Sequence, residues 1–243
     1  MLLLLCAVAA ASPDPAALAA AFDLPPPDAA GAPVQLWSTH YILHEAQEVS
    51  VQDGLPLLDV GEGAFPPEAP VHLTERDWCY AALEGSARIS RLDGTVVTVN
   101  YAGVGALAVD CGPPLGNARW RSQGTVRFGH AVGPYGDGVS GYALVPFRTL
   151  ATDPSVIPTG SVVYIPSAVG VRFTHAGQAF THDGYFFAAD VGGAIKGPHI
   201  DTFTGTQPSP FPHVGDKPAA TFEAHVLSGG SALEAVLGAL HGG

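Results

Sequence analysis

Residues 186–205 read Phe-Phe-Ala-Ala-Asp-Val-Gly-Gly-Ala-Ile-Lys-Gly-Pro-His-Ile-Asp-Thr-Phe-Thr-Gly, and the interpretation of the whole chain depends on them. An apolar run at 186–189 ends in Asp190, and a second carboxylate, Asp201, follows eleven residues later. A buried strand that ends on an acid, a tight turn and an acid on the next strand would bring two carboxylates into one small volume. On spacing alone, the alternative is a hairpin with two solvated aspartates at its ends.

The turn between the two acids is rich in glycine. Gly192, Gly193 and Gly197 carry no Cβ, so the backbone there can adopt positive φ and can come close to itself or to a ligand. Lys196, in the same turn, could donate a hydrogen bond to a sugar or pair with one of the acids. The alternative for Lys196 is a solvated lysine at a turn.

The string Asp-Val-Gly-Gly-Ala-Ile-Lys-Gly, with Asp201 at its fixed distance, resembles the signature of the 3D domain, a family named for three aspartates. The third aspartate matches Asp153, which is followed by the apolar strand expected at 161–166. The C-terminal region of membrane-bound lytic transglycosylase A carries this domain. The resemblance implies a six-stranded double-psi β-barrel over residues 139–228 and cleavage of the glycan strands of peptidoglycan.

The resemblance also implies roles for the site residues. Asp201 matches the single acid/base of the family. It would protonate the bridging oxygen and then take the proton of the C6 hydroxyl, which closes a 1,6-anhydro ring without water. Asp190 would orient or tune Asp201, and Asp153 would be a structural or substrate-positioning partner. No cofactor is needed. The residues expected to shape the floor of the cleft are Gly192, Gly193 and Lys196.

The residue types suit this chemistry independently of the resemblance. A carboxylic acid donates a proton near neutral pH only if its pKa is raised from about 4, which burial or a second carboxylate achieves. Asp201 stands between Ile200 and Phe203, with Asp190 as a possible neighbour. The competing hypothesis is a non-catalytic module that binds cell-wall carbohydrate, which a solvent-open Asp201 with an ordinary pKa would favour.

Composition limits the fold and the partners. With 47% apolar and 13% charged residues the chain can bury a core, and 30 Gly and 22 Pro favour many short strands, hence a mainly β fold. The net charge of −12, with only 10 Lys and Arg, argues against nucleic acid and against an anionic membrane surface. A sugar would therefore be held by hydrogen bonds and stacking. Trp120 is a candidate stacking residue, although an aromatic that anchors a loop is the alternative.

The N-terminal region suggests export. Residues 1–11 are apolar with small residues at the end, like a secretory signal, and they are too short to span a bilayer. A lipoprotein is disfavoured because Leu5 precedes Cys6. We expect a secreted, periplasmic or envelope protein, monomeric and without an integral membrane span. Cys79 and Cys111 would then form a disulfide or remain two buried thiols.

The rest of the chain divides into further segments. Residues 12–33 form a Pro/Ala-rich linker outside the core. Residues 34–138 form a small β-rich α+β segment that does not resemble the large second domain of the transglycosylase. A helix and tail follow the barrel at 229–243. The elements expected within 34–138 are a strand at 34–43, a helix from Thr74 to Gly85, a hairpin about Asp93 and Gly94, and a strand at 103–109.

Histidines raise a metal hypothesis. His199 and Asp201 share one face of an expected strand, and His175 or His182 could complete a site. His40 and His44 are a second, weaker pair, because on a strand they lie too far apart to chelate together.

Overall fold

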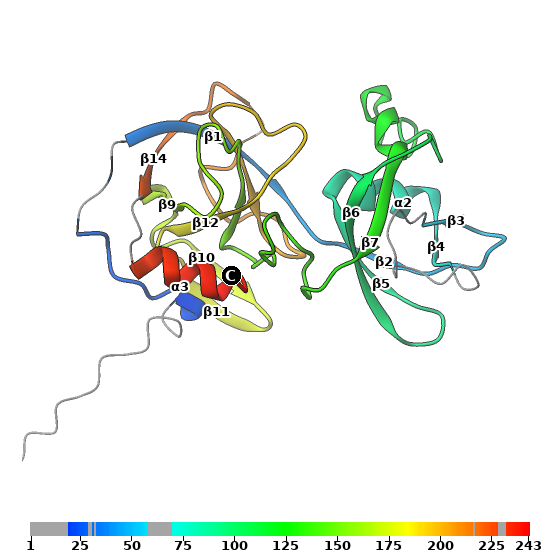
Figure 1. The fold of residues 1–243 in the computed structure, drawn as a ribbon, viewed down its shortest axis with the longest axis horizontal. Coiled ribbons are helices and arrows are strands. Elements are labelled where there is room, and N and C mark those ends of the chain that lie inside the picture. The colour runs from blue at the N-terminus through cyan, green and yellow to red at the C-terminus, as the bar shows by residue number, and fades with distance from the viewer. Residues whose placement is uncertain (1–18, 29–30, 32, 58–69, 216, 228–231) are drawn as a thin grey trace, which may run out of the picture.

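The computed structural model describes residues 19–28, 31, 33–57, 70–215, 217–227 and 232–243. The signal-like segment 1–11 lies outside these residues. The described chain forms two bodies, a barrel and a smaller second domain, and two segments connect them (Figure 1). The chain leaves the barrel after its first strand, builds the second domain from residues 44–130, and returns to complete the barrel.

The barrel is closed, in the strand order β1-β13-β8-β12-β9-β14, and confirms the double-psi barrel expected from the sequence. The pairs β1/β13 and β8/β12 are parallel, and the other four pairs are antiparallel. Its strands are β1 (Pro33–Tyr41), β8 (Thr149–Ala151), β9 (Val162–Tyr164), β12 (Tyr185–Asp190), β13 (His199–Phe203) and β14 (Phe222–Leu227).

The position of β1 corrects the expected division of the chain. The sequence pattern predicted this strand in the N-terminal segment, whereas it pairs with β13 and β14 inside the barrel. A parallel pair needs a long crossover connection, so its two strands lie far apart in sequence and no local pattern shows that they are partners. The second domain is therefore an insertion between the first and second strands of the barrel.

The alternation of the barrel strands determines which side chains face outward. Leu36 of β1 and Ile200 of β13 lie in the main hydrophobic core, together with Leu150 and Phe186. Because successive residues of a strand point to opposite faces, Asp201 points away from this core. The sequence of β13 thus places its carboxylate on the outer surface of the barrel wall.

The described stretch 19–28 before β1 contributes to the core, which corrects the expectation of a linker there. Phe22 is buried in the main core, and the guanidinium of Arg148 lies 4.1 Å from its ring centroid. Arg148 also donates to the carbonyl of Ala19 and makes two hydrogen bonds of 2.6 and 2.7 Å to Asp183. The backbone N–H of Leu24 donates to the same carboxylate. A single buried ion pair therefore fastens this segment to the barrel.

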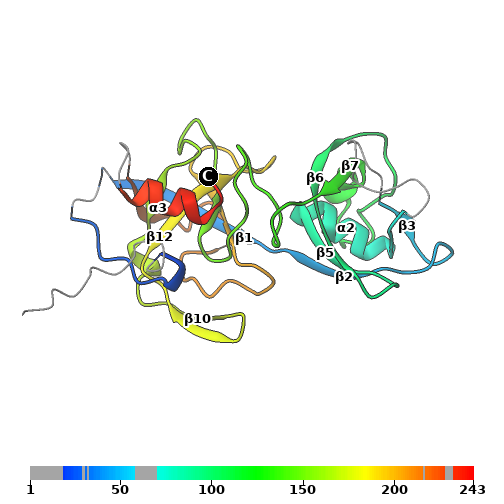
Figure 2. The ribbon, with the colours of Figure 1, turned by 60° about the horizontal axis from the view of Figure 1, so that its bottom comes forward.

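The second domain packs a helix against a four-stranded sheet of order β2-β5-β6-β7 (Figure 2). Helix α2 (Glu75–Glu84) begins after the capping residue Thr74 and ends at Gly85 in the left-handed conformation, as expected. The 91–95 turn confirms the expected hairpin. The other elements are β2 (His44–Gln47), β3 (Leu55–Pro56), β4 (His72–Leu73), β5 (Ser86–Ser90), β6 (Val96–Val104), η1 (Ala118–Thr125) and β7 (Val126–His130).

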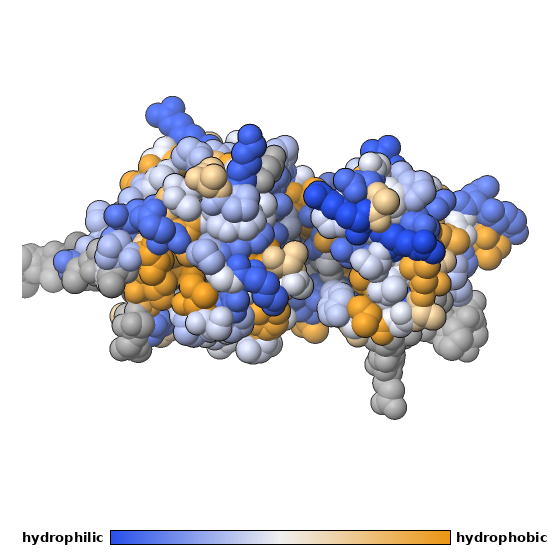
Figure 3. Space-filling model, turned by 90° about the horizontal axis from the view of Figure 1, so that it is seen from above, coloured by the Kyte–Doolittle hydropathy of each residue, from blue (hydrophilic) through white to orange (hydrophobic). Residues whose placement is uncertain are grey.

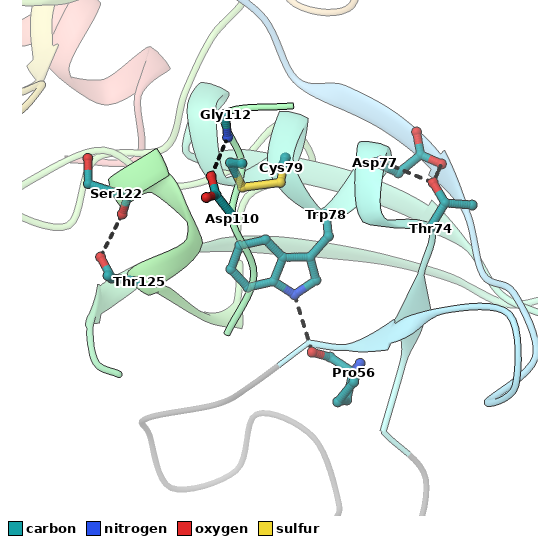
Figure 4. The surroundings of a disulfide bond; sticks show 10 residues. Pro56, Thr74, Asp77, Trp78, Cys79, Asp110, Gly112, Ser122 and Thr125 are labelled. Atoms are coloured by element: carbon teal, nitrogen blue, oxygen red, sulfur yellow. Dashed lines mark hydrogen bonds between the residues drawn. A yellow bond between two sulfur atoms is a disulfide. The ribbon is translucent and has the colours of Figure 1, made fainter. Parts of the chain in front are cut away.

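The expected strand at 103–109 is wrong, because β6 ends at Val104. The chain then turns toward Cys111, which forms a disulfide with Cys79 of α2 (Figure 4). The indole of Trp78 lies beside this disulfide and donates a hydrogen bond to the carbonyl of Pro56. The disulfide and Trp78 together form the centre of the core of the second domain.

Three smaller elements and one helix complete the barrel body. They are η2 (Pro166–Ala168), β10 (Arg172–His175), β11 (Gln178–Thr181) and α3 (Ala232–Leu240). The hairpin β10/β11 was not among the elements expected from the sequence. Helix α3 packs on the outer face of β12. No helix in the described ranges is both long and apolar enough to cross a membrane.

Candidate active site

The strand β8 brings the two acids of the glycine-rich stretch to one level. Ala151 pairs on one side with Asp190 of β12 and on the other side with Asp201 of β13. Since neighbouring strands lie about 4.8 Å apart, the Cα atoms of the two acids are about 10 Å apart. The sequence correctly indicated that a strand, a turn and a second strand bring these carboxylates together.

The carboxyl of Asp201 is held from β1. Thr39, its register partner, donates from its hydroxyl to Oδ1 of Asp201 at 2.9 Å. The same hydroxyl lies 2.9 Å from Nε2 of His199. The ring of His199 is stacked on Trp37, with 3.5 Å between ring centroids. These contacts involve only Oδ1, so among the described hydrogen bonds Oδ2 of Asp201 has no protein partner.

Asp190 is held on both oxygens. The hydroxyl of Tyr41 donates to Oδ2 at 2.8 Å, and the backbone N–H of Val191 donates to Oδ1 at 2.8 Å. Burial raises the pKa of Asp190 to about 6, and the two hydrogen bonds oppose that rise. Burial and the charge of Asp190 hold the pKa of Tyr41 well above its usual range, so the phenol keeps its proton and remains a donor.

A third acid, Glu84, comes from the second domain. It is the last residue of α2, and its Oε2 accepts a 2.9 Å hydrogen bond from the backbone N–H of Ile42. Burial raises the pKa of Glu84 to about 7. Three residues of the site were not predicted from the sequence: Glu84, Thr39 and Tyr41. Their only local signals were an acid at a helix C-terminus and the period-two spacing of two polar residues on β1.

Asp201 therefore has the electrostatics of a proton donor. Burial raises its pKa from 3.8 to about 7, and the charges of Glu84 and Asp190 act in the same direction, while the hydrogen bond from Thr39 acts against them. No ion pair in the described parts of the chain includes Asp190, Asp201 or Glu84. A carboxyl with this pKa is partly protonated at neutral pH and can act as both acid and base.

Asp153 lies in a different environment. Its Oδ1 accepts from the N–H and the hydroxyl of Ser155, and its Oδ2 accepts from the N–H of Gly197 at 2.8 Å. These bonds, that of Gly197 first, lower the pKa of Asp153 to about 2. The ionised side chain thus ties its own loop to the glycine-rich turn. The structure does not bring it into the hydrogen-bond network of Asp190 and Asp201.

The glycine-rich turn is tight at one position and open at another. A Cβ on Gly192 would lie 2.6 Å from Cγ1 of Ile195, whereas a Cβ on Gly193 would meet no atom within 4 Å. Gly197 has φ of 62°. Lys196 is exposed, and its charge acts on Asp153.

Trp120 lies on η1 of the second domain, on a different body from the aspartates, where the guanidinium of Arg119 covers its ring at 4.3 Å. The acids lie near the end of β1, where the chain crosses to the second domain. The surface is indented between the two bodies (Figure 3).

The metal hypotheses are not supported by the positions of the histidines. His182 is buried in the barrel core, where one ring nitrogen contacts the carbonyl of Phe147 and the other accepts from the N–H of Gly184. In the second pair, Nε2 of His44 contacts Asp77. No group of three or more His, Cys, Asp or Glu within the described ranges has the geometry of a metal site.

Comparisons with known proteins agree with the fold and the motif. The 3D domain family matches residues 148–220. A comparison with curated proteins finds no matching sequence.

Solved structures match over most of the chain. MltA of E. coli with bound chitohexaose has a TM-score of 0.55 at 20% identity, covering 80% of this chain and 72% of that one. A membrane-bound lytic murein transglycosylase of Agrobacterium tumefaciens has 0.54 at 15%, covering 82% and 76%. MltA of Neisseria gonorrhoeae has 0.51 at 14%, covering 82% and 74%.

The likeness in fold therefore extends well beyond the matched motif and includes part of the inserted domain, where the sequence showed no resemblance. At such identities the likeness to the solved structures concerns the fold alone. Only the 3D-domain motif relates individual residues of this chain to those of the family. Residues 148–220 thus match the 3D domain, and this chain has the fold of the MltA lytic transglycosylases.

Proposed function

We propose that the protein is a peptidoglycan lytic transglycosylase that cleaves the bond between MurNAc and GlcNAc and leaves 1,6-anhydro-MurNAc ends. The observation that carries the proposal is the carboxyl of Asp201, which is held on one oxygen by Thr39 and has its pKa raised to about 7. A group of this kind can donate a proton to the leaving oxygen at neutral pH.

The reaction uses Asp201 in both protonation states. Its proton, on the oxygen without a protein partner, passes to the glycosidic oxygen as the bond to C1 breaks. The resulting carboxylate then accepts the proton of the C6 hydroxyl, whose oxygen attacks C1 and closes the anhydro ring. Asp201 ends the cycle protonated, so the reaction consumes no water and no external acid.

The partners of Asp190 favour this route over hydrolysis. A hydrolase that uses two carboxylates needs the second one free to activate water or to attack the sugar. Both oxygens of Asp190 already accept hydrogen bonds, from Tyr41 and Val191. We assign Asp190 to tuning Asp201 through its charge. Asp153 would hold the glycine-rich turn in shape for the substrate.

The remaining expected substrate contacts become proposals of different strength. There is open space around Gly193, and the ammonium of Lys196 is exposed at the same turn. Gly192 allows the turn to pack closely on Ile195. These features suit the floor of a sugar site. Trp120 would contribute stacking only if a glycan strand also reached the second domain.

The competing hypothesis is a carbohydrate-binding module without catalysis. A solvent-open Asp201 with an ordinary pKa would support it, and the burial of Asp201 among two other acids argues against it. We further propose that the protein works as a monomer on glycan strands in the periplasm or on the cell surface, because that is where its substrate lies.

The test is a digest of purified peptidoglycan by the wild type, Asp201→Asn and Asp190→Asn, with the products identified by mass spectrometry. We expect muropeptides ending in 1,6-anhydro-MurNAc from the wild type and a loss of at least about 100-fold in Asp201→Asn. Reducing ends would instead identify a hydrolase. Sedimentation of all three proteins with the sacculi, without any product, would favour the binding module.

A further inference from the structure

The placement of Glu84 is unfavourable for stability. It is an acid at the C-terminal end of α2, where the helix dipole disfavours negative charge, and the last turn of the helix contains no basic residue. Its side chain is half-buried, and no described ion pair includes it. Buried acids with raised pKa values and no structural partner of opposite charge cluster at functional sites.

The end of β1 and the residue after it bind all three acids. Thr39 donates to Asp201, Tyr41 donates to Asp190, and the N–H of Ile42 donates to Glu84. The three acids come from β13, from β12 and from the second domain. One short backbone segment therefore sets their relative positions. The distance of Glu84 from Asp201 depends on how the second domain docks on this segment.

None of the described groups that face Asp201 carries a positive charge that would favour loss of its proton. Thr39 and Tyr41 come from β1, Asp190 comes from β12, and His199 comes from β13, the strand that also carries Asp201. The pKa of His199 is lowered by burial, so its ring is neutral at pH 7. The phenol of Tyr41 is neutral too. The charges that act on Asp201 from these neighbours are thus the two carboxylates, Asp190 and Glu84.

We propose that Glu84 is a positioning residue for Asp201: in its ionised form the Glu84 carboxylate, which the second domain supplies, keeps the acid proton on Asp201. The catalytic role of Glu84 rests on the proposed function, whereas the electrostatic coupling between Glu84 and Asp201 does not. Docking of the second domain therefore brings the charge of Glu84 to Asp201. In a barrel without this domain, a smaller fraction of Asp201 would be protonated at neutral pH.

The test removes the charge and keeps the hydrogen bond. In Glu84→Gln the amide oxygen still accepts from the N–H of Ile42, so the docking contact is preserved. Glu75→Gln is the matched control, because Glu75 is an exposed acid in the first turn of the same helix. The Asp201 carboxyl is titrated by ¹³C NMR in each protein, with Asp201→Asn to assign its signal. The pH profile of kcat/KM on peptidoglycan is measured in parallel.

We expect the titration midpoint of Asp201 to fall by roughly half to one pH unit in Glu84→Gln and not in Glu75→Gln. The rate would then fall about 3- to 10-fold at pH 8 and little at pH 5.5. An unchanged midpoint, or an equal change in the control, would overturn the inference whatever the activity. A shifted midpoint in a protein that makes no anhydro product would support the coupling and would refute the proposed function alone.

Discussion

Replacing Asp201 by Asn should stabilise the fold while it abolishes activity. The pKa of Asp201 is about 7 in the folded protein, against an ordinary value of 3.8. An acid whose pKa is raised by folding costs no stability below its unfolded pKa. The cost grows as the pH rises from about 4 to 7 and then stays constant. Asn carries no charge and can still accept the hydrogen bond from Thr39.

The magnitude follows from linkage. Each pH unit between the two pKa values is worth about 1.4 kcal/mol of unfolding free energy, so the ionised carboxyl costs at most about 4 kcal/mol. Because the side chain keeps some contact with water, which screens its interactions, we expect about half of this, roughly 2 kcal/mol, to be recovered at pH 8. At pH 4 the two proteins should be nearly equal in stability.

The assay is urea unfolding of the wild type and Asp201→Asn at pH 4, 6 and 8. Asp153→Asn provides a comparison of opposite sign, because folding lowers the pKa of Asp153 and its charged form accepts three hydrogen bonds. That variant should lose stability at neutral pH. If Asp201→Asn gained the same stability at pH 4 and pH 8, or lost stability at pH 8, the assignment of Asp201 as a desolvated acid would be wrong.

Two further predictions concern the two cores. Arg148→Met should destabilise the protein by about 3–5 kcal/mol in urea, because it leaves Asp183 buried without its partner; a loss below 1 kcal/mol would contradict the role given to this pair. Replacing Cys79 and Cys111 together by Ala should cost about 2–4 kcal/mol, because a cross-link over 32 residues is removed. Limited proteolysis should then cut first within the second domain, and initial cleavage in the barrel would argue against this account.

Several features of this protein were predictable because their causes are local. The caps at Thr74 and Gly85 define α2 whatever the helix packs against, since a side-chain oxygen and a missing Cβ act within one turn of the helix. The run from Asp190 to Asp201 likewise contains the end of one strand, a turn and the next strand, although β8 lies between these two strands in the barrel. The sequence therefore indicated two of the three acids of the site and the barrel that carries them.

Other features were not predictable because they depend on contacts between distant segments. Phe22 belongs to a stretch with a linker-like composition, and only its contact with Arg148 places it in the core. The strand β1 looks the same whether it pairs within the N-terminal region or with β13. Long-range pairing decides which, and no short-range signal encodes it.

The amino-acid sequence alone determined the fold family, the two aspartates and the type of chemistry they suit. Only the tertiary structure decided that both oxygens of Asp190 accept hydrogen bonds and that Asp153 accepts one from the glycine-rich turn. It also decided that Glu84 joins the site from an inserted domain. The physical reason is that a pKa and a free oxygen are set by burial and by neighbours in space. Those neighbours are brought together when the chain crosses between its two bodies.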